Sequence, residues 1–180
     1  ETSPILVEEL TPTPMSIGEI QKVLSKLLDE SVSVRNLPII FETLADYSKL
    51  TSDVDVLTEY VRQSLARQIT TQYAGNQQEL KVLTVSAKVE KAIADSIQQT
   101  DHGNYLALDP QMSQAILESI AAELERVSFI DQSPVILCSP AVRMYVRQLT
   151  ERYFPQIPIL SYNELDASIE IQSVGVVNVE

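Results

Sequence analysis

The sequence is poor in the residues that most enzymes and metal sites use for chemistry. It has one cysteine, Cys138, and one histidine, His102, among 180 residues. A single cysteine excludes an internal disulfide, and one thiolate with one imidazole cannot make up the ligand set of a zinc site. We therefore expect a reducing compartment and no bound metal.

Glycine is also scarce, and the four glycines, at positions 18, 75, 103 and 175, form no cluster. Loops that hold phosphates need clustered glycines whose backbone amides can turn onto an anion. A Walker loop and a dinucleotide fingerprint are both missing from the sequence. It therefore favours neither an ATPase nor a Rossmann dehydrogenase, and we expect no cofactor.

Long apolar runs are missing too. No run reaches the roughly 18 apolar residues that span a bilayer, and no charged, apolar and small-residue series forms a signal peptide. The first residue is Glu1 and not methionine. We expect a soluble chain that is a piece of a longer protein, with any membrane anchor outside it.

Negative charge is in excess, with 25 acidic against 13 basic residues and a net charge of −12. Nucleic acid would be repelled by such a surface, and Arg143, Arg147 and Arg152 are too few to make a basic stripe. With 44% hydrophobic and 21% charged residues, the composition is typical of a globular protein. We expect a folded acidic module that binds other proteins and is not an enzyme.

The first half of the sequence has the periodicity of helices that pack on one another. Ser16 and Glu19 form a capping box, which predicts that a helix starts there. Two further periodic segments run from about Val34 to Tyr47 and from about Asp53 to Tyr73. Together they predict a bundle of three amphipathic helices. The residues expected to face inward are Ile17, Ile20, Val23, Leu24, Leu27 and Leu28, then Leu37, Ile40, Phe41, Leu44 and Tyr47, then Leu57, Tyr60, Val61, Leu65, Ile69 and Tyr73.

The second half alternates short apolar runs with helical patterns. Asp109 before Pro110, and Ser139 before Pro140, are each an N-cap residue followed by proline at the first helical position. Alternating strands and helices predict a small, largely parallel α/β sheet. The predicted division is a helical subdomain at 1–77 and an α/β subdomain at 78–180. The predicted strands are Leu80 to Val85, Tyr105 to Leu108, Pro134 to Cys138, Ile157 to Leu160 and a closing strand within Ile169 to Val179.

Two patterns leave room for chemistry. Cys138 and Ser139 lie where a strand meets a helix, a place where a nucleophile can be activated. No base accompanies them in the sequence, so the favoured interpretation is a core cysteine and a capping serine. Asp53 and Asp55 have the spacing of the first calcium-loop ligands, but the glycine and the later glutamate are missing. We interpret these aspartates as helix-start residues.

Several segments together resemble the FlhA family, the flagellar type III export-gate proteins whose relatives serve virulence systems. The similarity covers nearly the whole chain, with its weakest parts at Lys88 to Tyr105 and around Phe129 to Ser133. The segments that carry it are LVEEL (Leu6 to Leu10), QKVLSKLLDESVSVRNLPIIFETLADYS (Gln21 to Ser48), LTEYVRQSLARQIT (Leu57 to Thr70), PVILCSPAVRMYVRQLTERYFPQIPILSYNEL (Pro134 to Leu165) and QSVGVV (Gln172 to Val177).

The resemblance implies a parent protein with a membrane domain upstream and a cytoplasmic domain at the cytoplasmic face of the bacterial membrane. In that family the cytoplasmic domains form a nonameric ring that receives chaperone–substrate complexes and the export ATPase assembly with other export-apparatus proteins. The chaperone groove lies in upstream subdomains. By their place in the matched helices, we predict Arg35, Asp46, Tyr47 and Arg62 as contacts between subunits.

Two alternatives stay open at this stage. A small α/β enzyme that uses Cys138 or Ser139 would lose activity when Cys138 is replaced. A soluble regulatory module, unconnected with secretion, would come from a parent without membrane spans.

Overall fold

The computed structural model describes residues 15–129 and 133–180. Contacts divide the chain into two units, residues 1–72 and 73–180, whereas the predicted boundary lies at residues 77 and 78. The segment Leu6 to Leu10 lies outside the described residues. Within the described ranges, no helix has the length and apolar character needed to cross a membrane.

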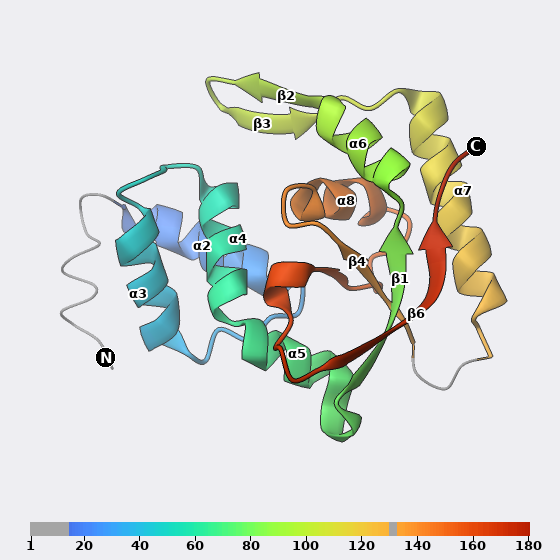
Figure 1. Cartoon of the computed structure of the whole chain (residues 1–180). Helices are drawn as coiled ribbons and strands as arrows, with labels where there is room; N and C mark the ends of the chain where they lie inside the picture. Colours follow the sequence, from blue (N-terminus) through green and yellow to red (C-terminus); the bar gives the residue numbers. More distant parts are fainter. Residues whose placement is uncertain (1–14, 130–132) are drawn as a thin grey trace. The chain divides into compact units, whose positions relative to one another are not determined.

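The first unit is built from helices, as predicted (Figure 1). The central helix α4 contacts both α2 and α3. The capping box at the start of α2 is confirmed: the Glu19 backbone amide donates to Ser16 Oγ at 3.1 Å, and the Ser16 amide donates to the Glu19 carboxylate at 3.2 Å. The helices are α2 (Ile17–Asp29), α3 (Leu37–Tyr47), α4 (Val54–Ser64) and α5 (Ala66–Ala74).

The predicted third helix is wrong in one respect, because it is two helices, α4 and α5, separated at Leu65. The hydrogen bonds nevertheless continue across the break: the Leu65 amide donates to the Val61 carbonyl at 3.0 Å, and the Ile69 amide donates to the Leu65 carbonyl at 2.9 Å. Leu65 is itself buried. The break therefore leaves the apolar side of this segment facing the core.

The predicted inward face of α2 is too wide. Ile20, Val23 and Leu27 are buried, whereas Ile17 and Leu28 keep 65% and 56% of their surface exposed. Periodicity places all five on one broad apolar arc, but α4 covers only part of that arc. The remainder of the arc is an apolar strip on the surface of the helical unit.

The second unit contains a four-stranded parallel sheet in the order β5-β4-β1-β6, which confirms the predicted sheet and its closing strand. Side chains from alternate strand positions, including Leu83, Ile136 and Cys138, pack against α6, α7 and α8. The strands are β1 (Glu79–Val85), β4 (Val135–Cys138), β5 (Ile159–Ser161) and β6 (Glu170–Val177); the helices are α6 (Ala87–Asp95), α7 (Pro110–Arg126) and α8 (Arg143–Thr150), with short 3-10 turns at Gly75–Gln77 and Tyr162–Glu164.

Two predictions for this unit are wrong. The run Tyr105 to Leu108 is not in the main sheet, because β3 (Gly103–Leu106) pairs with β2 (Ile97–Thr100) in an antiparallel hairpin. Ser139 is not an N-cap, since α8 begins only at Arg143 after a turn. The prediction at Asp109 is confirmed: its carboxylate accepts from the Gln111 amide at 2.8 Å at the start of α7.

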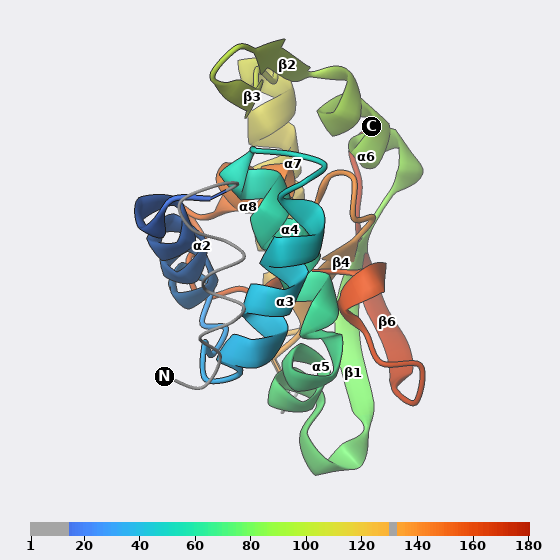
Figure 2. The same ribbon diagram turned by 90° about the vertical axis from the view of Figure 1, so that its left-hand side faces the viewer.

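The edge strand β6 lies beside β1 in both views (Figures 1 and 2). Its register with β1 shifts by one residue, because Val82 pairs with Ser173 and Leu83 pairs with Gly175. The extra residue is Val174, whose carbonyl accepts a hydrogen bond from the guanidinium of Arg126 on α7. The bulge in the edge strand is thus held from the neighbouring helix.

Candidate functional site

The strand-to-helix junction at Cys138 does not have the geometry of a catalytic site. The Cys138 side chain is fully buried, and its thiol lies 3.7 Å from the Leu160 carbonyl. The Ser139 amide donates to the Glu90 carboxylate at 2.9 Å, which fixes the turn before α8. His102 is exposed in the β2–β3 turn. A substrate would not reach the thiol, which argues against Cys138 as the nucleophile of the alternative enzyme.

The aspartates with calcium-loop spacing are used at a helix start. Asp53 caps α4 by accepting from the Asp55 and Val56 amides at 2.9 and 3.4 Å. Asp55 in turn binds the Lys26 ammonium at 2.7 Å, and this hydrogen bond is the main cause that raises the pKa of Lys26. Among the described residues, no group of three or more histidine, cysteine or acidic side chains could hold a metal ion.

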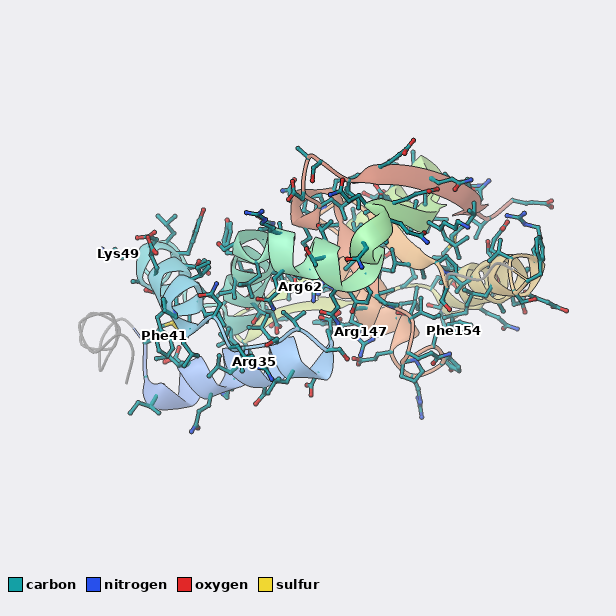
Figure 3. All side chains as sticks on the ribbon, turned by 90° about the horizontal axis from the view of Figure 1, so that it is seen from below. Arg35, Phe41, Lys49, Arg62, Arg147 and Phe154 are labelled. Atoms are coloured by element: carbon teal, nitrogen blue, oxygen red, sulfur yellow. The ribbon has the colours of Figure 1, made fainter. Side chains whose placement is uncertain are left out.

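The four predicted subunit contacts differ in how deeply they are buried in the helical unit. Arg35, just before α3, and Asp46, on α3, are exposed. Tyr47 is half-buried and stacks on Tyr60, with ring centroids 4.0 Å apart and planes 10° apart. Figure 3 labels Arg35 and Arg62 in this unit. Arg35 and Asp46 are therefore on the surface of the helical unit.

Arg62 is placed differently, since its side chain is only 2% exposed. Its guanidinium lies 3.8 Å from the carboxylate of Glu30, at the end of α2. A charge buried in this way is held by its partner, because removing one member leaves the other desolvated. Arg62 thus connects α4 to the end of α2 through a buried ion pair beneath the surface of the helical unit.

A second buried ion pair, missed by the sequence-based reasoning, organises the α/β unit. Arg143 and Glu164 are each 1% exposed, and Nε of Arg143 lies 3.6 Å from the Glu164 carboxylate. Arg143 also donates to the Ile159 carbonyl at 2.8 Å. The pair therefore connects α8, β5 and the turn that follows β5. One signal could have shown it: Arg143 lies three residues before the buried Val146, on the inward side of α8.

The surface of the α/β unit has an open apolar hollow of about 690 Å³ along α7. A second hollow adjoins it and shares part of its lining. Side chains from α7, the segment before it and the segment after α8 line both hollows. The shared residues are Leu108, Ser113, Leu117 and Tyr153. Such a surface suits the docking of a protein segment better than the enclosure of a small molecule.

Comparison with known proteins gives matches along nearly the whole chain. The chain is 62% identical over 179 residues to the flagellar biosynthesis protein FlhA of Bacillus subtilis. The matched region covers 99% of this chain and 26% of that protein. The predicted resemblance is therefore confirmed. The chain spans about a quarter of the length of this curated relative.

Solved structures agree with the sequence match. The CdsV protein of Chlamydia pneumoniae has a TM-score of 0.90 and 34% identity, covering 98% of this chain and 50% of that one. CdsV has also been solved in complex with CdsO. The nonameric cytosolic domain of EscV, from a type III secretion system, has a TM-score of 0.76 and 34% identity, covering 96% and 51%.

The predicted fold class is confirmed by these structures, since the helices and the parallel sheet superpose on cytosolic domains of this group. The names of these relatives refer to flagellar biosynthesis and type III secretion, and none refers to a catalysed reaction. The model of the FHIPEP family matches residues 1–170, and the protein belongs to that family.

Proposed function

We propose that this chain is the distal part of the cytosolic domain of a flagellar type III export gate. It works by binding, as part of a nonameric ring that receives chaperone–substrate complexes and the export ATPase assembly at the membrane. The observation that carries the proposal is the 62% identity to the B. subtilis protein over 99% of the chain. Identity at that level over both units favours a shared role.

The structure supports a binding role through the chemistry of its surfaces. The single thiol is buried, Asp53 caps a helix, Asp55 pairs with Lys26, and the buried ion pairs hold elements together. Among the described residues, the surface carries an apolar hollow on the α/β unit and an apolar strip on α2. We assign the helical unit to contacts within the ring and the α/β unit to one wall of the docking cleft.

Within the helical unit, Arg35 and Asp46 are proposed to contact a neighbouring subunit, because both are exposed on or next to α3. Tyr47 and Arg62 are proposed to hold the helices behind that contact in position. Tyr47 does so by stacking on Tyr60, and Arg62 by its ion pair with Glu30. An exposed ion pair contributes roughly 0–1 kcal/mol. Charge reversal therefore has its effect through assembly, where the contact recurs in every subunit.

The test is an exchange in B. subtilis, with this chain replacing the segment of FlhA that it matches. The chimera is expected to restore swimming to a strain that lacks FlhA. Arg35→Glu and Asp46→Lys in the chimera are expected to reduce swimming while the protein accumulates normally. The matched control is Lys91→Glu, a charge reversal on the exposed surface of α6. Cells that carry this control variant are expected to swim like cells with the unaltered chimera.

Each result has a separate meaning. Loss of swimming in the unaltered chimera, at normal protein levels, would argue against the export-gate function. If both the Arg35→Glu and the Asp46→Lys chimeras swim normally, these residues do not form the ring contact. The proposed function would not be affected by that result.

A further inference from the structure

The 3-10 turn after β5 turns its side chains in opposite directions. Tyr162 and Asn163 are exposed, and Tyr162 keeps 50% of its surface, whereas Glu164 is only 1% exposed. The Leu165 amide donates to the Tyr162 carbonyl at 3.4 Å and closes the turn. An aromatic ring therefore lies on the surface of a turn that is anchored through a buried carboxylate.

The anchor of this turn is a pair of buried charges, which is a poor device for stability. Arg143 and Glu164 are both 1% exposed, and the Arg143 guanidinium also donates to the Ile159 carbonyl at 2.8 Å. The removal of two charges from water offsets most of the attraction between them, so apolar side chains of similar volume stabilise such a site equally well or better. Apolar side chains do not, however, supply a directional contact that selects one conformation of the turn.

Ser161, directly before the turn, is a second departure from what stability favours. Its side chain is 1% exposed, and within residues 15–129 and 133–180 its hydroxyl has no hydrogen-bond partner. A buried polar group without a partner lowers stability. Natural proteins depart from these rules mainly at functional sites. Two such departures, at Ser161 and at Glu164, lie on either side of Tyr162 in the sequence.

The last part of the chain, which includes this turn, is acidic. From residue 153 to residue 180 it has no lysine, arginine or histidine, and it has Asp166, Glu170 and Glu180 besides the paired Glu164. The whole chain has a net charge of −12. The face of an aromatic ring attracts the cation of an arginine or lysine, and an acidic surface draws basic partners toward it. The charge therefore favours a basic partner for Tyr162.

Building on the proposed function, we infer that Tyr162 is a docking anchor for a basic segment of another protein of the export apparatus. An arginine or lysine of that segment lies over the ring of Tyr162. Arg143 and Glu164 are positioning residues, because they act through the turn and keep Tyr162 on the surface. Exposed tyrosines in fixed positions are frequent anchors of protein interfaces.

The test uses the B. subtilis chimera, with immunoblots of filament protein in the medium and of the chimera in the membrane. Tyr162→Leu keeps an apolar side chain but removes the aromatic face. Exported filament protein should fall at least about fivefold, the factor that about 1 kcal/mol of cation–π attraction represents. Tyr162→Phe keeps the ring and should export like the unaltered chimera. So should the matched control Tyr105→Leu on β3, where the tyrosine is 51% exposed.

The positioning role is tested by the double variant Arg143→Met with Glu164→Leu. No charge is left unpaired in this variant, so the purified chain should unfold at the same urea midpoint as the original or at a higher one. The turn loses its directional contact, and export should fall as it does in Tyr162→Leu. A pair with a purely structural role would instead give normal export in a double variant of normal stability.

Four results would overturn the inference. If Tyr162→Leu exports normally, or if Tyr105→Leu loses as much export, Tyr162 is not a specific anchor. If Tyr162→Phe loses as much export as Tyr162→Leu, the hydroxyl and not the face of the ring makes the contact. A stable double variant with normal export, or an unstable double variant, would remove the positioning role of the pair. If the unaltered chimera does not export, the proposed function itself has failed.

Discussion

Replacement of Gly175 by alanine tests how the edge strand β6 is held. A Cβ atom at this position would lie 2.5 Å from the Glu123 carboxylate, 2.6 Å from the Arg126 guanidinium and 2.9 Å from Cδ2 of Leu83. The Glu123 and Arg126 side chains could move, but movement of Arg126 would break its hydrogen bond to Val174. Leu83 is fully buried in the core. Gly175 is therefore required by packing.

The expected cost follows from these contacts. Overpacking of a well-filled site typically costs 1–3 kcal/mol, and we expect Gly175→Ala to lower the free energy of unfolding by about 2 kcal/mol. The matched control is Gly18→Ala on the exposed side of α2, where the nearest heavy atom to the new Cβ is Ser16 Oγ at 3.8 Å. There we expect a small stabilisation, up to about 1 kcal/mol, because alanine favours the helix.

The measurement is urea unfolding followed by tyrosine fluorescence and circular dichroism, since the chain has no tryptophan. Arg126→Ala removes one of the obstructing side chains and frees Glu123 to move. In that background Gly175→Ala should cost clearly less than it does alone. An equal loss in both backgrounds, or a Gly175→Ala protein as stable as the Gly18→Ala control, would refute the packing argument.

Three further predictions concern side chains of both units. Glu164→Gln should destabilise the protein by about 3 kcal/mol in urea, because Arg143 would keep a buried charge without its carboxylate; a loss under about 1 kcal/mol would contradict this. The Lys26–Asp55 pair is half exposed, so Lys26→Met should cost less than about 1 kcal/mol at pH 7. The pKa of Lys26 is raised in the folded protein, so the stability lost in Lys26→Met should be fully measurable at pH values below the ordinary lysine pKa. This loss of stability should shrink as the pH rises through the raised pKa of Lys26. Cys138 should resist thiol reagents in the native protein and react on unfolding, and rapid native labelling would disagree with its burial.

Local signals in the sequence predict the starts of several elements correctly. The capping box at Ser16 and the pair Asp109 and Pro110 each act within a few residues, so their geometry needs no knowledge of the rest of the fold. Ser139 before Pro140 has the same local signature and fails. There the Glu90 carboxylate of α6 binds the Ser139 amide, and a contact across 49 residues in sequence decides the turn.

Other elements could not be predicted because their patterns are ambiguous or weak. The strand β2 begins with Ile97 and continues with polar residues, so it lacks the alternation that indicates a strand. The apolar arc of α2 is continuous in the sequence, and nothing in its spacing shows that Ile17 and Leu28 lie outside the core. The width of a buried face depends on the neighbouring helices.

The candidate site shows the same limit. The family resemblance led to Arg35, Asp46, Tyr47 and Arg62, and the structure places the first two on the surface and the last two at least partly inside. Sequence position alone cannot separate a residue that contacts a partner from one that supports the surface behind it. The burial of Arg62 beside Glu30 supplies that distinction.

The proposed role of this chain as part of a protein export gate is tested most directly by measuring export itself. Filament protein in the culture medium would be quantified by immunoblotting for B. subtilis cells whose FlhA carries this chain in place of the matched segment. Export close to that of the unmodified strain is expected. Export at the level of a strain without FlhA, with the chimera present in the membrane in normal amount, would contradict it.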